Sequence, residues 1–294
     1  MTLAQIIAAR AARTLLLLAL VAAGTVLLMR FSPGYLSDAR EMDAKYAQAA
    51  QSDLASEQAH HGTLRQIASS TLGGWVHGNL GQSRQYDVPV ADLLRPRLAV
   101  TALLLARGIG WGWLLAFSTA LPLSAASTLS ARNLPRLAST ALGTPFTLLL
   151  AIPVGAMATL CLLGNTGGPV LVLALILAAR DYKFLHRAFT DAWHAPHLLH
   201  ARAGGLRLHQ LTRGYVLPNV APQILALATL SLVTSLSAIV PVEVLFDVPG
   251  IGQLAWNAAL NRDLPVLMTI TLLMAAAVSA ATALSTESRP AKIA

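Results

Sequence analysis

The segment from His200 to Asn219 concentrates charged and imidazole side chains in a chain that is otherwise mostly apolar. It reads HARAGGLRLHQLTRGYVLPN and holds three arginines, two histidines and a Gly-Gly pair. One interpretation is a solvated loop whose charge only sets the orientation of a membrane protein. The other is a surface built to dock a partner. Which interpretation holds depends on the helices and loops that position this segment.

Metal binding and catalysis are both poorly supported by the residues at hand. His194, His197 and His200 are spaced by three residues and can line one helix face. A metal site needs three or four convergent ligands and supporting outer groups, and Pro196 interrupts the run. We therefore predict a solvated face, with no metal site. No G-x-x-x-x-G-K-[ST] phosphate loop and no spaced Ser/His/Asp set is found, so no catalytic residue is predicted.

The composition is that of a polytopic membrane protein. Apolar residues make up 55% of the 294 positions and charged residues only 12%, against about 25% in soluble domains. A membrane-spanning helix needs about 20 apolar residues. We predict an all-α protein with about six spans, at 14–29, 98–124, 137–163, 168–179, 220–240 and 265–285. The short fourth span is expected in protein-lined surroundings. Cleavage of the first span as a signal peptide is the alternative at the N-terminus.

The distribution of lysine and arginine orients these spans. Basic residues lie at the N-terminus, between spans two and three, between spans four and five, and in the tail, whereas the opposite loops are nearly neutral. Both termini are therefore predicted to be cytoplasmic. The predicted regions are 1–30 (cytoplasmic segment and first span), 31–97 (extracytoplasmic), 98–285 (a five-helix core with a cytoplasmic loop at 180–218) and 286–294 (cytoplasmic tail).

The large cytoplasmic loop has an internal order. Gly204 and Gly205 can adopt positive φ and end a short helix. Leu208, Leu211 and Tyr215 then recur at helical spacing. Pro218 suits the first turn of the next span, where its missing N–H is not needed. This succession favours a docking element.

Three segments resemble the permeases of ATP-binding-cassette (ABC) importers for dipeptides, oligopeptides and nickel. The first is HARAGGL from His200 to Leu206, followed by Leu217-Pro218, which resembles the family's T-A-R-A-K-G-L loop. The second, GNLGQSRQYDVPVADLLRPRLAVTAL from Gly78, resembles G-D-L-G-x-S, P-V and R-L-x-x-T. The third, VEVLFDVPGIGQLAWNAALNRDLP from Val242, resembles V-E-x-x-F-x-x-P-G-x-G-x-L and R-D-x-P. The three occur in the family's order.

The resemblance implies a type I ABC importer permease in a bacterial inner membrane. It implies a second permease subunit, two cytoplasmic ATPases that carry ATP and Mg, an extracytoplasmic solute-binding protein, and no cofactor on this chain. By this resemblance the loop couples to the ATPase through Ala201, Arg202, Gly205, Leu206, Arg207, Leu211, Arg213 and Pro218. The outer segment forms the gate or contacts the binding protein through Glu243, Phe246, Pro249, Gly250 and Gly252.

Several alternatives stay open. A secondary transporter would need carboxylates within its spans and two similar halves, and neither is seen. A permease fold that has lost transport is a second possibility. The substrate can be a peptide or nickel, and the scarcity of histidine and cysteine within the spans favours peptides. Arg107 either snorkels or lines a path. The small residues Ser231, Ser235 and Ala238 either pack against another helix or line the path, and packing is favoured.

Overall fold

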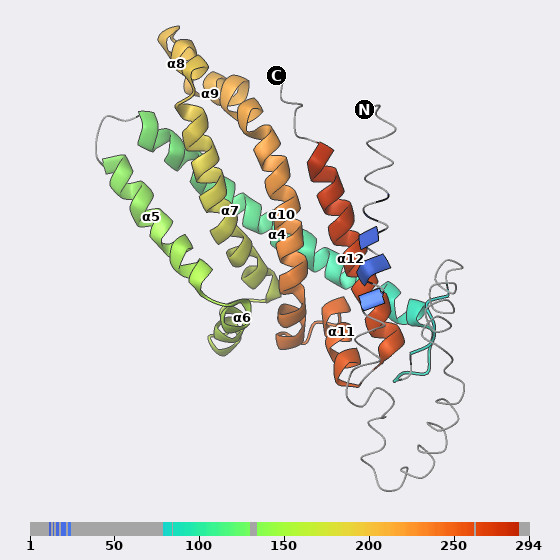
Figure 1. Ribbon diagram of the computed structural model, residues 1–294. Helices are drawn as coiled ribbons and strands as arrows, with labels where there is room; N and C mark the ends of the chain where they lie inside the picture. Colours follow the sequence, from blue (N-terminus) through green and yellow to red (C-terminus); the bar gives the residue numbers. More distant parts are fainter. Residues whose placement is uncertain are drawn as a thin grey trace, which may run out of the picture. The chain divides into compact units, whose positions relative to one another are not determined.

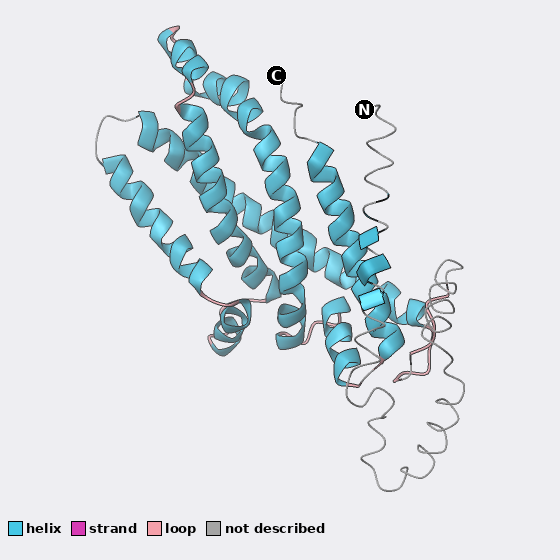
Figure 2. Cartoon of the chain, in the orientation of Figure 1, coloured by secondary structure: helices cyan, strands magenta, loops and turns pink. Residues whose placement is uncertain are grey.

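The computed structural model describes residues 79–83, 85–129, 134–261 and 263–287, together with single positions between 12 and 24. Within these ranges the chain is almost entirely helical, and the only extended pairing is an isolated bridge between Gln82 and Pro89 (Figure 2). The predicted all-α fold is confirmed. Half of the positions of the first predicted span, and the whole segment 31–77, lie outside the described residues.

The described helices follow one another with short connections (Figure 1). In chain order they are α4 (Val90–Leu129), α5 (Leu134–Ala151), α6 (Val154–Leu163), α7 (Pro169–Trp193), α8 (Pro196–Ala203), α9 (Leu208–Leu211), the π-helix η2 (Thr212–Val216), α10 (Leu217–Leu245), α11 (Ile251–Leu260) and α12 (Leu264–Glu287).

These helices form two compact units. Among the described residues, the first unit holds 79–100 and 249–280, and the second holds 101–248 and the end of α12. The helix α4 therefore gives its first turns to one unit and residues 101–129 to the other. Each unit has its own buried core.

Three helical stretches in the described part of the chain are long and apolar enough to cross a membrane. They are Val90–Ser127, Leu208–Leu245 and Leu264–Ala283. The first two contain the second and fifth predicted spans, and the third covers the sixth except for its last two residues. The third predicted span, 137–163, is not a straight helix: it bends by 103° between Ala151 and Val154. Pro153 explains the break, because a proline cannot donate the backbone hydrogen bond that would continue α5.

The fourth predicted span, 168–179, is only the first half of α7. The helix continues for 25 residues to Trp193, through charged positions that had been assigned to a loop. Its apolar residues Tyr182, Leu185, Phe189 and Trp193 recur at helical spacing and are all buried. Protein-lined surroundings were expected for this span, and the extent of burial along α7 confirms them.

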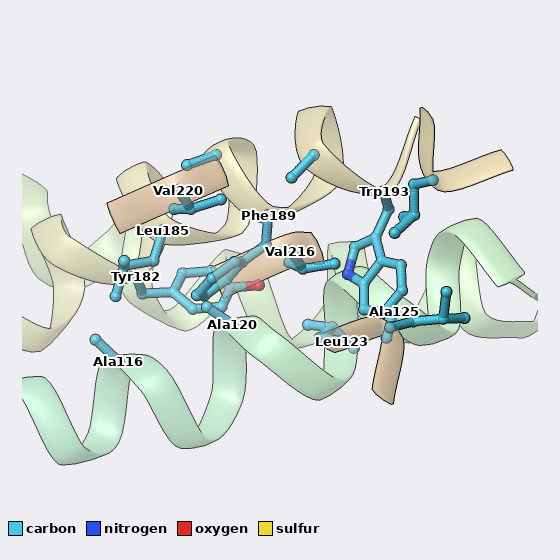
Figure 3. Close-up of a cluster of buried hydrophobic side chains, with 14 of the residues drawn as sticks. Ala116, Ala120, Leu123, Ala125, Tyr182, Leu185, Phe189, Trp193, Val216 and Val220 are labelled. Atoms are coloured by element: carbon cyan, nitrogen blue, oxygen red, sulfur yellow. The ribbon is translucent and has the colours of Figure 1, made fainter. Parts of the chain in front are cut away.

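The core of the second unit surrounds α7. Ala116, Ala120, Leu123 and Ala125 of α4 face the buried side chains of α7, and Val216 and Val220 close the cluster from η2 and α10 (Figure 3). Phe189 meets Phe117 edge to face, with ring centroids 5.9 Å apart, and Tyr182 stacks on Phe146 at 4.4 Å. Aromatic pairs at such separations add to the stability that burial alone provides.

Two glycines let α4 approach α7 closely. A Cβ atom added at Gly108 would lie 2.8 Å from Cβ of Leu173, and one added at Gly112 would lie 2.9 Å from Cβ of Leu177. Small residues four positions apart on one helix face are typical of tightly packed membrane helices. This contact fixes the position of α7, and with it the start of the segment at 194–216.

The core of the first unit joins three helices. Val90 and Leu94 of α4 pack with Ile251, Leu254 and Ala258 of α11, and Val266 and Ile270 of α12 complete the cluster. The three residues from α11 lie at i, i+3 and i+7, so a single face of this helix is buried. The core places the end of the segment 242–265 against the segment 79–94.

Candidate functional site

The segment between α7 and α10 is helical, and we call residues 196–216 the turn. It consists of α8, the glycine pair Gly204-Gly205, α9 and η2. Gly205 adopts a φ of +78°, whereas Gly204 has a φ of −74°. Positive φ is therefore confirmed at Gly205 and wrong at Gly204. The amides of both glycines donate back into α8, to the carbonyls of Arg202 and His200, so the turn closes the helix without unpaired donors.

A hydrophobic base holds this turn on the rest of the unit. Trp193, Leu198, Leu211 and Val216 are at most 4% exposed and belong to one cluster with Leu123 and Ala125 of α4. Figure 3 shows the Trp193 ring beside Leu123 and Ala125. The segment 196–216 is thus helical and packed on the core of the unit rather than an irregular loop.

Burial corrects the predicted docking set at two positions. Ala201 and Leu211 are 9% and 4% exposed, because both side chains pack into the base. They hold the segment together and present little surface to a partner. The exposed residues of the predicted set are Arg202, Gly205, Leu206, Arg207, Arg213 and Pro218. Two further exposed apolar residues, Leu199 and Leu208, were missed, although their position beside the arginines was a usable signal.

The helix that follows the turn runs from Leu208 to Leu245 without a break. The amide of Leu217 donates to the carbonyl of Thr212, five residues earlier, which defines the π-helical turn. Pro218 lies in the first turn of α10, as predicted. A proline ring clashes with the carbonyl four residues before it in an α-helix, and the wider π turn relieves that clash. The turn and α10 are therefore joined by an uninterrupted helix.

The opposite end of α10 carries the first residues of the outer segment. The helix extends to Leu245, so Glu243 lies inside it and not in the connector that begins at Pro241 in the sequence prediction. The Glu243 side chain is fully buried, and its Oε1 accepts a hydrogen bond of 2.6 Å from the Thr101 hydroxyl of α4. Glu243 therefore ties α10 to α4 and is not available to a docked protein.

The remaining residues of the outer segment divide by exposure. Gly250 and Gly252 are buried at the start of α11, Phe246 is half-buried, and Pro249 is exposed. The sharp turn falls on Asp247, which has a φ of +51°, whereas Gly250 is extended at −106°. The chain bends again at Gly250, within the Pro-Gly-x-Gly stretch. Of the five predicted gate residues, only Phe246 and Pro249 present surface.

A second buried hydrogen bond between distant segments lies within the first unit. Ser83 and Asp263 are almost fully buried, and the Ser83 hydroxyl donates to Oδ2 of Asp263, which also accepts from the amide of Gln85 at 3.2 Å. Ser83 comes from the G-x-L-G-x-S motif and Asp263 from the R-D-x-P motif. The motifs that carried the resemblance are thus physical partners, as are Thr101 and Glu243.

A polar network at mid-length of α7 was not predicted. The carboxylate of Asp181 is fully buried and pairs with the Arg180 guanidinium at 3.3 Å. It also accepts a 2.7 Å hydrogen bond from the Ser231 hydroxyl of α10. Sequence reasoning missed this network because Arg180 and Asp181 were assigned to a loop. The helical spacing of the apolar residues after them was the available signal.

The exposure of individual side chains bears on the other residues that the sequence analysis singled out. Ser231, Ser235 and Ala238 are all buried, which confirms that this stripe packs against other helices. His194, His197 and His200 are exposed, and the described residues contain no group of three potential ligands that could hold a metal ion. Arg107 is exposed on α4.

Comparisons with known proteins agree with this arrangement. The family model described as the binding-protein-dependent transport system inner membrane component matches residues 120–286. A Brucella ovis protein provisionally named a peptide permease is 27% identical over 70% of this chain and 72% of its own length. The Staphylococcus aureus metal-staphylopine import permease CntB and the Escherichia coli oligopeptide permease OppB are each 27% identical, over 36% and 37% of this chain and 34% and 35% of theirs.

The fold also has a counterpart among solved structures. An inward-facing structure of the MetNI methionine ABC transporter aligns with a TM-score of 0.50 and 16% identity, over 67% of this chain and 99% of the matched chain. The family match and the fold together define a membrane permease of the ABC importer type. The chain belongs to the family of binding-protein-dependent transport system inner membrane components. Members are transport subunits of the bacterial inner membrane, and separate subunits hydrolyse ATP.

Proposed function

We propose that this chain is the permease subunit of an ATP-driven importer for dipeptides or oligopeptides. The observation that carries the proposal is the turn at 196–216, which exposes Leu206 among arginines and continues directly into α10. A docking surface that moves as one body with a membrane helix can pass a movement from an ATPase to the membrane. The proposed contact with the ATPase is made by the exposed residues Arg202, Gly205, Leu206, Arg207, Arg213 and Pro218.

The proposed assembly follows from the family. It contains a second, related permease chain, two cytoplasmic ATPases that bind ATP and Mg, and an extracytoplasmic solute-binding protein. This chain itself holds no cofactor. Both termini lie in the cytoplasm, because the basic residues gather on that side. Pro249 and the half-buried Phe246 are the residues proposed to face the path or the binding protein.

Peptides are favoured as the substrate by the extent of the similarity. The relative named a peptide permease aligns with 70% of this chain, whereas the oligopeptide permease OppB and the relative named for metal-staphylopine import align with 37% and 36%. A chelated metal ion is the second candidate, since the same fold serves that relative and a chelate needs no ligands from the path. A permease fold without transport is the third.

Uptake in living cells separates these three functions. A labelled tripeptide and nickel, free and chelated, are supplied to cells with and without this gene, and accumulation is measured. We expect the deletion to abolish tripeptide uptake and to leave nickel uptake intact. Loss of nickel uptake alone would reassign the substrate, and no change in either would favour the transport-inactive fold. Complementation with the intact gene controls for effects on neighbouring genes.

A further inference from the structure

Four polar residues join α7 to α10 halfway along both helices. Arg180 donates through Nε and Nη2 to Oδ1 of Asp181, each at 3.3 Å. Its Nη2 lies 3.5 Å from the Ser231 hydroxyl, and its Nη1 donates to Thr234. Ser231 in turn donates to Oδ2 of Asp181 at 2.7 Å. We call these four residues the α7–α10 tie.

The tie also includes a contact from α4. The indole N–H of Trp113 donates to the Ser231 hydroxyl oxygen at 3.2 Å. The Ser231 proton has two acceptors within reach, the carboxylate of Asp181 and the carbonyl of Leu227 at 2.9 Å. The charged acceptor forms the stronger hydrogen bond, so the proton is directed to α7. One hydroxyl thus connects three helices.

Burial makes this connection costly to break. Asp181 and Ser231 are fully buried, and 24% of the Arg180 side chain is exposed. A buried carboxylate has to keep its cation and its hydrogen bonds, because no water replaces them. The two helices therefore cannot slide past each other at this level without leaving Asp181 unsatisfied.

The tie lies at a similar distance from the turn at 196–216 along both helices. Asp181 is 12 residues before the end of α7, and Ser231 is 15 residues after the end of η2. At 1.5 Å per residue these are about 18 and 22 Å along the two helices. The hydrophobic base with Trp193 and Val216 joins the same two helices at their near ends. The helices α7 and α10 are thus joined at two places, by the hydrophobic base next to the turn and by the tie halfway along their length.

We infer that the α7–α10 tie makes these two helices one lever, so that movement at the turn reaches the middle of the permease. Asp181, Ser231 and Thr234 are then positioning residues for transport. The inference rests on the proposed function, because a lever has meaning only if the turn is driven by an ATPase. Without the tie, the helices absorb the movement by sliding, and ATP is hydrolysed without import.

Ser231→Ala tests the tie against a matched control. Ser235 lies one turn further along α10 and is equally buried. Among the described residues, its hydroxyl donates to the carbonyl of Leu232 in its own helix. Ser235→Ala removes the same atom without breaking a contact between helices. The complete importer with its binding protein is reconstituted in vesicles, and tripeptide import and ATP hydrolysis are both measured.

We expect Ser231→Ala to lower the amount of tripeptide imported per ATP about fivefold or more, with ATP hydrolysis retained. Ser235→Ala should match the wild type, and Ser231→Thr should restore the ratio because it keeps the hydroxyl. A defect in folding would instead lower import and hydrolysis together. If Ser231→Ala assembles poorly, Thr234→Ala removes a partner of Arg180 at the exposed edge of the tie and provides the same comparison.

Equal import per ATP in Ser231→Ala, Thr234→Ala and Ser235→Ala would overturn the inference and leave the proposed function standing. Failure of the wild type to import tripeptide, with normal hydrolysis stimulated by the binding protein, would overturn the proposed substrate instead. In that case the amount imported per ATP is measured for the same variants with the solute that the binding protein carries.

Discussion

Gly205 is the residue at which the turn depends on a single backbone conformation. Its φ of +78° lies in the left-handed region, and the space around a Cβ atom added there is empty. A side chain at this position therefore meets no clash and is disfavoured only by the backbone. For a non-glycine residue, that conformation costs about 1–2 kcal/mol.

Replacing Gly205 with Val should disorder the exposed turn and leave insertion into the membrane unchanged. We expect binding-protein-stimulated ATP hydrolysis and import to fall several-fold at equal membrane abundance. Gly205→Asn should retain most activity, since Asn tolerates positive φ. Gly204→Ala is the neighbouring control: its φ is negative, and an added Cβ lies 3.4 Å from the carbonyl of Ala201. Normal import by Gly205→Val would contradict the role of the turn.

At the scale of elements, the close approach of α4 to α7 depends on Gly108 and Gly112. Gly112→Ala places a Cβ atom 2.9 Å from Leu177 and 3.1 Å from the carbonyl of Ala174, so the helices have to move apart. Such overpacking costs about 1–3 kcal/mol. We expect the midpoint of thermal unfolding in detergent, followed by tryptophan fluorescence, to fall for Gly112→Ala and for Gly108→Ala.

Gly110 provides the control on the same helix. Nothing lies within 4 Å of a Cβ atom added there. Alanine favours a helix interior over glycine by about 1 kcal/mol, so Gly110→Ala should leave the midpoint unchanged or raise it. A fall as large as that of Gly112→Ala would mean that the contact with α7 does not decide the packing of α4.

At the scale of the whole molecule, the turn and α11 are separated by one membrane-length helix, Leu208–Leu245. From this membrane-length helix we predict that Leu206 and Asn261 lie on opposite sides of the membrane. Leu206 and Asn261 are both exposed and suit substitution by cysteine, after the buried Cys161 has been replaced by alanine.

In intact cells we expect a membrane-impermeant maleimide to label Asn261→Cys and to spare Leu206→Cys. Inverted vesicles should give the opposite result. The single Cys161→Ala variant reports background labelling. Labelling of Leu206→Cys in intact cells would place both termini and the exposed turn outside the cytoplasm, and would remove the basis for ATPase docking.

The sequence by itself determined the class of protein and the order of its elements. Apolar runs of membrane length, together with arginine on alternate loops, require a helical membrane protein whatever the contacts between its helices. The turn at Gly205 was also predictable, because two adjacent glycines after a short helical run mark a helix end. These features are local, so they are recorded in neighbouring residues.

Only the tertiary structure decided which polar residues meet. Ser83 and Asp263 are 180 residues apart, Thr101 and Glu243 are 142 apart, and Ser231 joins Asp181 across 50. Periodicity tells which face of a helix is apolar but not which helix covers it. Residues 180–187 were assigned to a loop because they carry several charges, but only Asp181 among those charges is buried. Its neighbour Arg180 supplies the cation, whereas the Ser231 hydroxyl comes from 50 residues away, and only folding brings it to the carboxylate.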